Sequence, residues 1–338
     1  MRVVIEKPLT WLESDRDGDR NRLMYAGVLN ALRGLGLDFV EEPIRYGSDF
    51  VARVASSDGI RLSYHSIGNA RNVWRLKETP IPYYYGIDRL GYSGWSELSV
   101  RPDQHEALVR QQDERRSETF CAGLAEWLRT NNLSKYRQAD VECKLPQRYV
   151  FFPMQVSTDV VARHNRLDPI AVLRRASRYA ARHGMPLVVK RHPYCRSWRV
   201  AAWIKWLALA NRHVHVTTAS ITRLLPSCSA VLVGNSGVGL EALVYGKPVY
   251  SFAASEYELV THPIRHLDEL ESIFAAGEHV RHRDAYRFVR YYLAECCFDA
   301  RSADDTRKKI ARIVRDAESG RWLPEEPACV NAQNDDTR

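Results

Sequence analysis

The sequence lacks the cysteine patterns that bind metals or form a disulfide framework. Its seven cysteines include no Cys-x-x-Cys pair, and the odd number is typical of reduced thiols in a cytoplasm. The chain opens with an apolar run far too short for a signal peptide, and no stretch approaches the roughly 20 apolar residues of a membrane span. We therefore expect a cytoplasmic protein, and contact with a membrane surface stays open.

Several common functional motifs are also missing. The sequence has no G-x-G-x-x-G fingerprint, Walker lysine or G-x-S-x-G elbow. No helix-turn-helix, zinc-finger or RNP-type sequence supports binding to nucleic acid. "HVH" (213–215) alternates faces along a predicted strand, and "HVRH" (279–282) has no nearby cysteine, so we expect no metal.

The chain does carry an excess of positive charge. Its net charge is +8 over 338 residues. That balance favours an anionic partner, which would be a phosphorylated ligand, a nucleic acid or an acidic membrane face. The alternative is a basic surface that is simply solvated. The length is typical of about two domains of ~150 residues each.

Hydrophobic periodicity predicts strands that alternate with helices. The first half has strands at 2–5 and 61–68 and helices at 21–36 and 117–136. After a polar linker (137–147), strands are predicted at 149–156, 186–190, 213–218, 230–234 and 247–252, with helices between them at 169–184, 199–212, 220–229 and 238–246. This alternation is typical of parallel sheets covered on both faces.

The resulting domain prediction has four parts. An N-terminal α/β domain spans 1–145 and a second α/β domain spans 146–300. The segment 301–324 contains a helix (304–318) that would pack back on the first domain. The polar tail at 325–338 is predicted to be disordered.

Three of the expected strand ends in the second half carry unusual polar residues. These are Gln155 and Asp159 after the first strand, Lys190, Arg191, His192 and Pro193 at the second, and Asn235, Ser236 and Gly237 at another. Doubly wound sheets bind ligands where parallel strands deliver their carboxyl ends. The glycines at 234, 237 and 239 permit positive φ and close backbone approach, and the following helix offers free N–H groups. Together these groups predict a phosphate cradle, with a plain strand–helix turn as the alternative.

Two carboxylates near these strand ends have a structural and a functional interpretation. Glu241 lies in the first turns of the helix after the glycine loop, where it would favour the helix dipole or accept a ribose hydroxyl. Asp159 would cap the next helix or take part in chemistry. The residues alone favour the structural interpretation for both.

The motifs "QVSTD", "KRHP" and "GNSGVGLEALVYGKPV" occur in this order over about residues 149–252. In this respect the chain resembles the capsule-type retaining β-Kdo glycosyltransferases of Gram-negative bacteria. "HP" followed by a serine loop is also similar to GT-B sialyltransferases. Arg191 departs from the pattern, because these families more often have a small or cyclic residue before His-Pro. It would contact the donor carboxylate or face solvent.

The resemblance implies an α/β fold of GT-B type, with two Rossmann-like domains facing a central cleft, and CMP-Kdo as the donor. It implies Asp159 as the nucleophile that forms a glycosyl-enzyme adduct, and His192 as the group that stabilises or protonates the phosphate. No metal or other cofactor would be required. The donor would be held by Gln155, Lys190, Arg191, Pro193, Asn235, Ser236, Gly237 and Glu241.

By analogy with the fold, the N-terminal domain would bind the acceptor glycan. Its aromatic and polar stretches offer His65, Tyr92 and Trp95 for stacking on a sugar. The acceptor would belong to a capsule, lipopolysaccharide or O-antigen, with or without a lipid carrier. A peripheral position at the cytoplasmic face of the inner membrane is compatible with this role, and nucleic acid is not an expected partner.

Three other functions stay open. The first is a GT-B glycosyltransferase with another donor, such as CMP-sialic acid or a UDP-sugar. The second is a glycan-binding module without catalysis, in which Asp159 and His192 would be dispensable. The third is a nucleic-acid-binding protein, whose binding would weaken strongly with salt.

Overall fold

The structure is a computed structural model that describes residues 1–15, 18–45, 59–138, 141, 144–156 and 159–320. Its contacts divide the chain into two compact units. The first consists of 1–77, 87–91 and 298–338, and the second of 78–86 and 92–297. The sequence-based boundaries at 145 and 300 stay a prediction. The tail predicted to be disordered, 325–338, lies outside the described residues.

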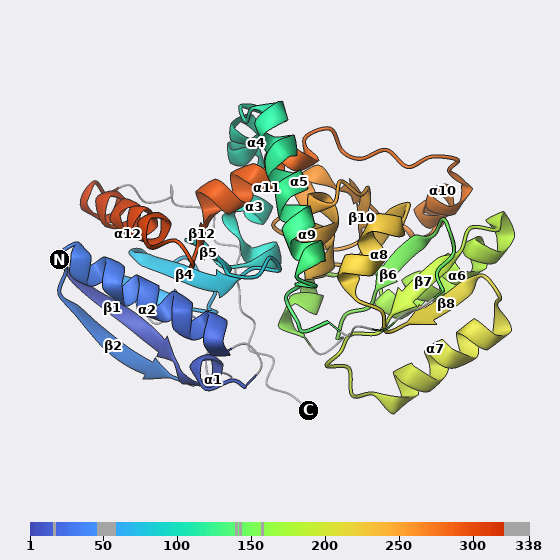
Figure 1. Cartoon of the computed structure of the whole chain (residues 1–338), viewed down its shortest axis with the longest axis horizontal. Coiled ribbons are helices and arrows are strands. Elements are labelled where there is room, and N and C mark those ends of the chain that lie inside the picture. Colours follow the sequence, from blue (N-terminus) through green and yellow to red (C-terminus); the bar gives the residue numbers. More distant parts are fainter. Residues whose placement is uncertain (16–17, 46–58, 139–140, 142–143, 157–158, 321–338) are drawn as a thin grey trace. The chain divides into compact units, whose positions relative to one another are not determined.

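A six-stranded sheet forms the core of the first unit, in the order β12-β5-β4-β3-β1-β2. Its pairs β2–β1, β1–β3 and β3–β4 are parallel. Helix α2 packs against the C-terminal helix α12, with the short α1 before α2 (Figure 1). The elements are β1 (Arg2–Pro8), α1 (Leu9–Leu12), α2 (Gly18–Gly34), β2 (Phe39–Ile44), β3 (Gly59–Tyr64), β4 (Val73–Glu78), β5 (Tyr84–Asp88), β12 (Cys297–Asp299) and α12 (Ala303–Glu318).

The second unit contains a six-stranded parallel sheet in the order β11-β10-β9-β6-β7-β8. The chain fills one half of this sheet with β6 to β8 and the other half with β9 to β11. The strands are β6 (Val150–Pro153), β7 (Leu187–Lys190), β8 (Val214–Thr217), β9 (Ala230–Val233), β10 (Val249–Ser251) and β11 (His262–Pro263).

Helices cover both faces of this second sheet. The helices of the second unit are α3 (Glu97–Val100), α4 (Pro102–Arg110), α5 (Glu114–Thr130), α6 (Pro169–His183), α7 (Trp198–Ala210), α8 (Ile221–Ser227), α9 (Gly237–Val244), α10 (Leu270–Ala275) and α11 (Ala285–Tyr291). Short 3₁₀ turns include η1 (Ser93–Trp95), η2 (Val160–His164), η3 (Glu258–Val260) and η4 (Leu267–Glu269), and a π-helical turn, η5 (Tyr292–Cys296), follows α11.

The central strands β6, β7 and β9 of this sheet are apolar on both faces, which explains their unbroken hydrophobic runs. In β6, Phe151 packs with α5, α8, α9 and α11 on one side, whereas Val150 and Phe152 pack with α6, α7 and α10 on the other. The same alternation continues in β7 and β9. A parallel sheet buried on both faces requires this composition. The strands and helices predicted for the second half are therefore confirmed, within a few residues at their ends.

Helix α5 ends earlier than its hydrophobic pattern predicts. The pattern continues to residue 136, but the helix stops at Thr130. Asn132 adopts φ of +48°, and the Leu133 N–H donates to the carbonyl of Leu128 at 2.9 Å. Asparagine tolerates the left-handed conformation that closes many helices. This early stop releases residues 133–138 from the helix.

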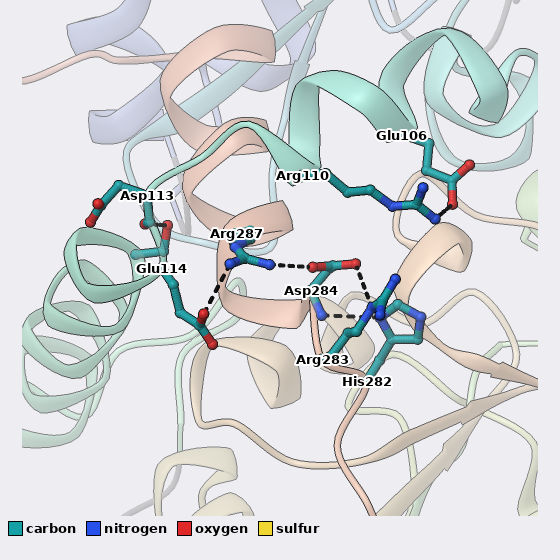
Figure 2. A network of polar contacts seen from close by, with 9 residues as sticks. Glu106, Arg110, Asp113, Glu114, His282, Arg283, Asp284 and Arg287 are labelled. Carbon is teal, nitrogen blue, oxygen red and sulfur yellow. Dashed lines mark hydrogen bonds and ion pairs between the residues drawn. The ribbon is translucent and has the colours of Figure 1, made fainter.

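An ion-pair network joins α5 to α11 within the second unit (Figure 2). Arg287 donates to Glu114 at 2.9 Å and to Asp284 at 2.8 Å. The Asp284 side chain is only 7% exposed, and Arg283 lies 3.5 Å from its other oxygen. Helix α11 also packs on α9, the helix that follows the glycine loop. The network therefore helps to hold α9 in place.

We expect Arg287→Met to lower the free energy of unfolding by about 1–3 kcal/mol, because Asp284 would stay buried without its main partner. The matched control is Arg110→Met, which removes an exposed pair with Glu106 on α4. That change should cost less than about 1 kcal/mol. Urea denaturation of both variants measures the difference, and equal effects would contradict a stabilising role for the network.

Candidate active site at the carboxyl edge of the second sheet

The second sheet reverses its strand order between β6 and β9, which are neighbours. From β6 the chain moves on to β7, and from β9 it moves the opposite way to β10. Ligands of open α/β sheets bind at such a switch point, outside the carboxyl ends of the strands. Gln155 follows β6 there, and Asn235 and Ser236 follow β9. The structure thus brings together two of the three predicted strand ends.

Asn235 ties the two strand ends to the segment that follows Asp159. Its Oδ1 accepts a hydrogen bond from Gln155 Nε2 at 2.8 Å. Its Nδ2 donates to the carbonyl of Val161 at 2.7 Å and to that of Ala254 at 3.3 Å. The amide of Asn235 is thus engaged within the protein on both sides. Asn235 is therefore placed to position the loop and η2, whereas Gln155 is half-buried beside it.

The three glycines of the loop are required for close packing. A Cβ at Gly234 would lie 2.5 Å from Gln155 Oε1, and one at Gly237 would lie 2.7 Å from Pro80. At Gly239 it would lie 2.5 Å from the hydroxyl oxygen of Tyr257. None of the three adopts a positive φ. Of the two properties that these glycines permit, the structure uses the close approach rather than positive φ, because neighbouring groups crowd the Cα atoms.

Ser236 is the N-cap of α9. Its Oγ accepts a hydrogen bond from the Val238 N–H at 3.4 Å, and its carbonyl accepts one from the Tyr257 hydroxyl at 2.6 Å. The start of α9 presents backbone N–H groups and the positive end of the helix dipole. This helix start suits an anion, as the glycine-loop pattern predicts.

Lys190 and Glu241 interact electrostatically within the second unit. The Lys190 ammonium donates to the carbonyl of Ala219 and, at 3.3 Å, to Gln138 Oε1. Glu241 is 2% exposed. Burial raises the pKa of Glu241 to about 8, against the opposing effects of a hydrogen bond from Ser134 and of Lys190 and Lys135. Because of this burial, Glu241 contributes to the core of the unit, and its ribose role stays a prediction.

We expect Glu241→Gln to stabilise the protein most at alkaline pH. Below its unfolded pKa of about 4.5 this carboxyl is neutral in the folded and the unfolded state, so its ionisation does not lower the free energy of unfolding. As the pH rises towards 8, only the unfolded state ionises, and the wild type loses stability that glutamine retains. Between pH 5 and pH 8.5 the advantage of the variant should grow by on the order of 3 kcal/mol. Urea denaturation at both values tests this, and parallel pH profiles would contradict it.

His192 lies in an aromatic and cationic cluster just past β7. Its Nδ1 accepts a hydrogen bond from the Tyr194 N–H at 3.1 Å, which leaves the proton of the neutral ring on Nε2. The centres of the His192 and Tyr136 rings are 5.3 Å apart, and the two rings are nearly perpendicular. Burial lowers the pKa of His192, Asp159 opposes the shift, and Lys135 adds to it. His192 is therefore a neutral Nε2–H donor at pH 7.

Lys135 supplies the positive charge of this cluster. Its ammonium lies 3.4 Å from Glu78 Oε1 and 5.6 Å from the centre of the Tyr136 ring. Burial lowers the pKa of Lys135, but Glu78 and Tyr136 outweigh it, so the pKa is raised. The carboxylate of Asp159 also raises the pKa of Lys135. Lys135 thus stays cationic at any ordinary pH.

Asp159 lies at the start of η2, exposed, with its Oδ1 accepting from the Val161 N–H at 3.3 Å. It interacts electrostatically with His192 and Lys135. The structure therefore brings the carboxylate and the histidine of the two predicted motifs into one cluster. Ser157 and Thr158, the middle of "QVSTD", lie outside the described residues, and Arg191 and Pro193 are exposed on the loop after β7.

The three residues predicted to bind the acceptor fall into different units. Tyr92 and Trp95 belong to the second unit, where the centres of the Trp95 and His164 rings are 4.2 Å apart in a T-shaped arrangement. A Cβ at Gly94 would lie 2.5 Å from that same imidazole. The turn that carries Tyr92 and Trp95 therefore packs on η2, which begins next to Asp159. His65 belongs to the first unit and packs on Trp11.

Sequence reasoning missed the contribution of the segment after α5. This segment provides Ser134, Lys135 and Tyr136, and Gln138 Oε1 accepts from the Ile221 N–H at 2.9 Å. Glu78 and Pro80 come from a still more distant stretch. The only signal was the pair of asparagines before "LSKYRQ", which ends the helix and precedes a cation and an aromatic residue.

Residues 122–261 match the sequence model of a family described as capsule polysaccharide biosynthesis protein. The chain is similar to capsule polysaccharide biosynthesis proteins. The predicted resemblance to this kind of protein is confirmed. The matched range lies within the second unit and includes Lys135, Asp159, His192 and Glu241. No curated protein sequence matches the chain.

Solved structures of sugar-transferring enzymes are similar to the chain at low identity. One is the beta Kdo 2,7 transferase of Thermosulfurimonas dismutans KpsC, with a TM-score of 0.50, 14% identity and coverage of 93% of this chain and 99% of that one. The beta Kdo 2,4 transferase of the same KpsC has a TM-score of 0.47 and 14% identity, and the match covers 86% of this chain and 90% of that one. AviGT4, a glycosyltransferase involved in avilamycin A biosynthesis, has a TM-score of 0.37 and 16% identity, and the match covers 96% of this chain and 100% of that one.

The first of these likenesses concerns the fold, and it confirms the predicted α/β fold of GT-B type. In the part of the chain that the structure describes, no three His, Cys, Asp or Glu side chains are grouped as a metal site.

Proposed function

We propose that the protein is a retaining β-Kdo glycosyltransferase that transfers Kdo from CMP-Kdo to a bacterial surface polysaccharide or glycolipid. The observation that carries this proposal is the cluster of Asp159, His192 and Lys135 in the same unit as the start of α9, a helix start that suits an anion. Such a cluster combines a carboxylate with donors for a phosphate. The order of the three sequence motifs and the family match support the same activity.

In the proposed reaction the phosphate of CMP gathers negative charge as the bond to C2 of Kdo breaks. The N–H groups at the start of α9, the Ser236 hydroxyl and the Lys135 ammonium would stabilise that charge. His192 would donate Nε2–H to a phosphate oxygen, since its Nδ1 already accepts from the backbone. Protein cations would thus supply the electrostatic stabilisation, and we propose that no metal takes part.

Asp159 would attack C2 from the face opposite CMP and form a covalent ester as CMP leaves. The acceptor hydroxyl would then attack C2 from the vacated face, break the ester and pass its proton to the released phosphate. Two inversions retain the configuration. An exposed carboxylate with a single backbone hydrogen bond can turn toward a bound sugar at little cost.

The acceptor would contact Tyr92 and Trp95, which we propose stack on its sugar rings. Both are half-buried, and both lie on the turn that packs against η2. The acceptor role of His65 is retained as a proposal on the aromatic environment that it shares with Trp11.

The test is to incubate the protein with CMP-Kdo and candidate acceptors and to measure released CMP and the mass of the product. The proposal predicts acceptor-dependent release from CMP-Kdo. Parallel reactions with CMP-sialic acid and UDP-sugars test the rival donors. If the protein turns over only one of these, that compound replaces CMP-Kdo as the donor. Binding of glycan without release of any nucleotide would instead indicate a non-catalytic module.

A further inference from the structure

Helix α7 has apolar side chains on two opposite faces. Ile204 and Leu207 are buried toward the sheet. On the other side, Trp198, Trp206 and Leu209 are 73%, 61% and 88% exposed. At 100° per residue these three side chains and Ala202 fall within about a quarter of the helix circumference. We call this stripe the outer face of α7, and Figure 1 shows the helix beyond β8, the last strand on that side of the sheet.

Positive charge borders the outer face. Arg199 and Lys205 are exposed on either side of it, and the Arg199 guanidinium lies 5.7 Å from the centre of the Trp198 ring. The surrounding sequence is also basic. Between Asp168 and Glu241 there are eleven Lys and Arg residues and no acidic residue.

This composition favours a lipid surface over a protein partner. Exposed apolar stripes of this kind mark an interaction site, since they are unfavourable in water. Cores of protein interfaces are depleted of lysine, whereas helices that lie on anionic membranes combine tryptophan and leucine with Lys and Arg at the edges. A symmetric contact between two copies would bring like charges together at Arg199 and Lys205. Tryptophan also prefers the membrane–water interface.

We propose that the outer face of α7 docks the protein on an anionic lipid bilayer, with the helix parallel to the surface. Docking by this helix requires no membrane span, and among the described residues no helix is long and apolar enough to form one. The loop from Arg191 to Ser197 carries His192 and joins β7 directly to α7. Bilayer binding would therefore hold that loop near the membrane surface, where a lipid-linked acceptor would be found if the proposed function is correct.

The experiment measures sedimentation with vesicles of phosphatidylcholine alone and of phosphatidylcholine mixed with phosphatidylglycerol. The wild type should bind the anionic vesicles and not the neutral ones. The triple variant Trp198→Ser/Trp206→Ser/Leu209→Ser should bind at least about tenfold more weakly, because three side chains lose their burial in the interface. The control Val280→Ser alters a side chain that is 72% exposed elsewhere in the unit, and it should bind like the wild type.

A second measurement uses vesicles that contain brominated lipids, which quench tryptophan emission on contact. Quenching in the wild type but not in the triple variant supports insertion of the outer face. The proposal is overturned if the wild type does not bind anionic vesicles or if the triple variant binds equally. It is also overturned if only Arg199→Gln/Lys205→Gln reduces binding, or if the triple variant instead dissociates a dimer. None of these readouts depends on catalysis, so failure here is distinguishable from failure of the proposed function.

Discussion

Asp159→Asn is expected to abolish sugar transfer, with turnover reduced by roughly 10³–10⁶-fold, as for other removed nucleophiles. Asparagine can keep the hydrogen bond to the Val161 N–H but cannot form the ester. The variant should therefore fold normally and still bind CMP. Melting temperature, CMP affinity by calorimetry and CMP release from CMP-Kdo measure the three properties.

The matched control is Asp168→Asn. Asp168 is the N-cap of α6, where it accepts from the N–H groups of Ile170 and Ala171. It has the same local role as Asp159, but at the start of another helix, so its replacement should leave turnover unchanged. Quenched reactions of the wild type should show a mass increase of one Kdo residue on the peptide that contains Asp159. An adduct on another residue, or full activity of Asp159→Asn, would refute the assignment.

His192→Ala should reduce turnover by about 10²–10⁴-fold, because the departing phosphate would lose its Nε2–H donor. The control is His183→Ala, which removes the 3.1 Å hydrogen bond between His183 Nε2 and Glu271 Oε1 at the end of α6. Its turnover should stay close to that of the wild type. A His192→Ala enzyme with near-normal turnover would remove His192 from the chemistry.

The titration of His192 provides an independent readout. Burial lowers its pKa in the free protein, so the ring should be neutral at pH 7 and become charged only below its ordinary value of about 6.5. A bound phosphate would favour the charged ring and raise this pKa. NMR titration with and without CMP measures the change. If CMP leaves the pKa of His192 unchanged, His192 does not contact the phosphate, even if the alanine variant is inactive.

The sequence was sufficient to predict the sheet of the second unit and the grouping of its polar strand ends. Phe151, Phe152, Val188 and Val189 form runs that only a sheet buried on both faces accommodates. Since parallel strands share one carboxyl edge, Gln155 and Asn235 had to approach each other, and they form a hydrogen bond. The catalytic and binding roles of these residues stay predictions.

The sequence was not sufficient to find groups whose position depends on tertiary contacts. Helical periodicity continues through Lys135 and Tyr136, but Asn132 in the left-handed conformation ends α5 before them. The burial of Glu241 could not be predicted either, because the sequence places this residue on a helix without showing what packs against that helix. Tyr92 and Trp95 precede the predicted boundary at 145, yet they pack with residues that follow it.

The crossing of the chain between the two units also determines how the protein can be divided. The second unit uses 78–86 and then 92–297, with a short stretch of the first unit between them. A fragment that begins at residue 92 would lack Glu78, the partner of Lys135, and Pro80, which covers Gly237. No single cut yields either unit whole. Exchange of donor specificity with a related enzyme by recombination would therefore need two junctions, one before residue 78 and one after residue 297.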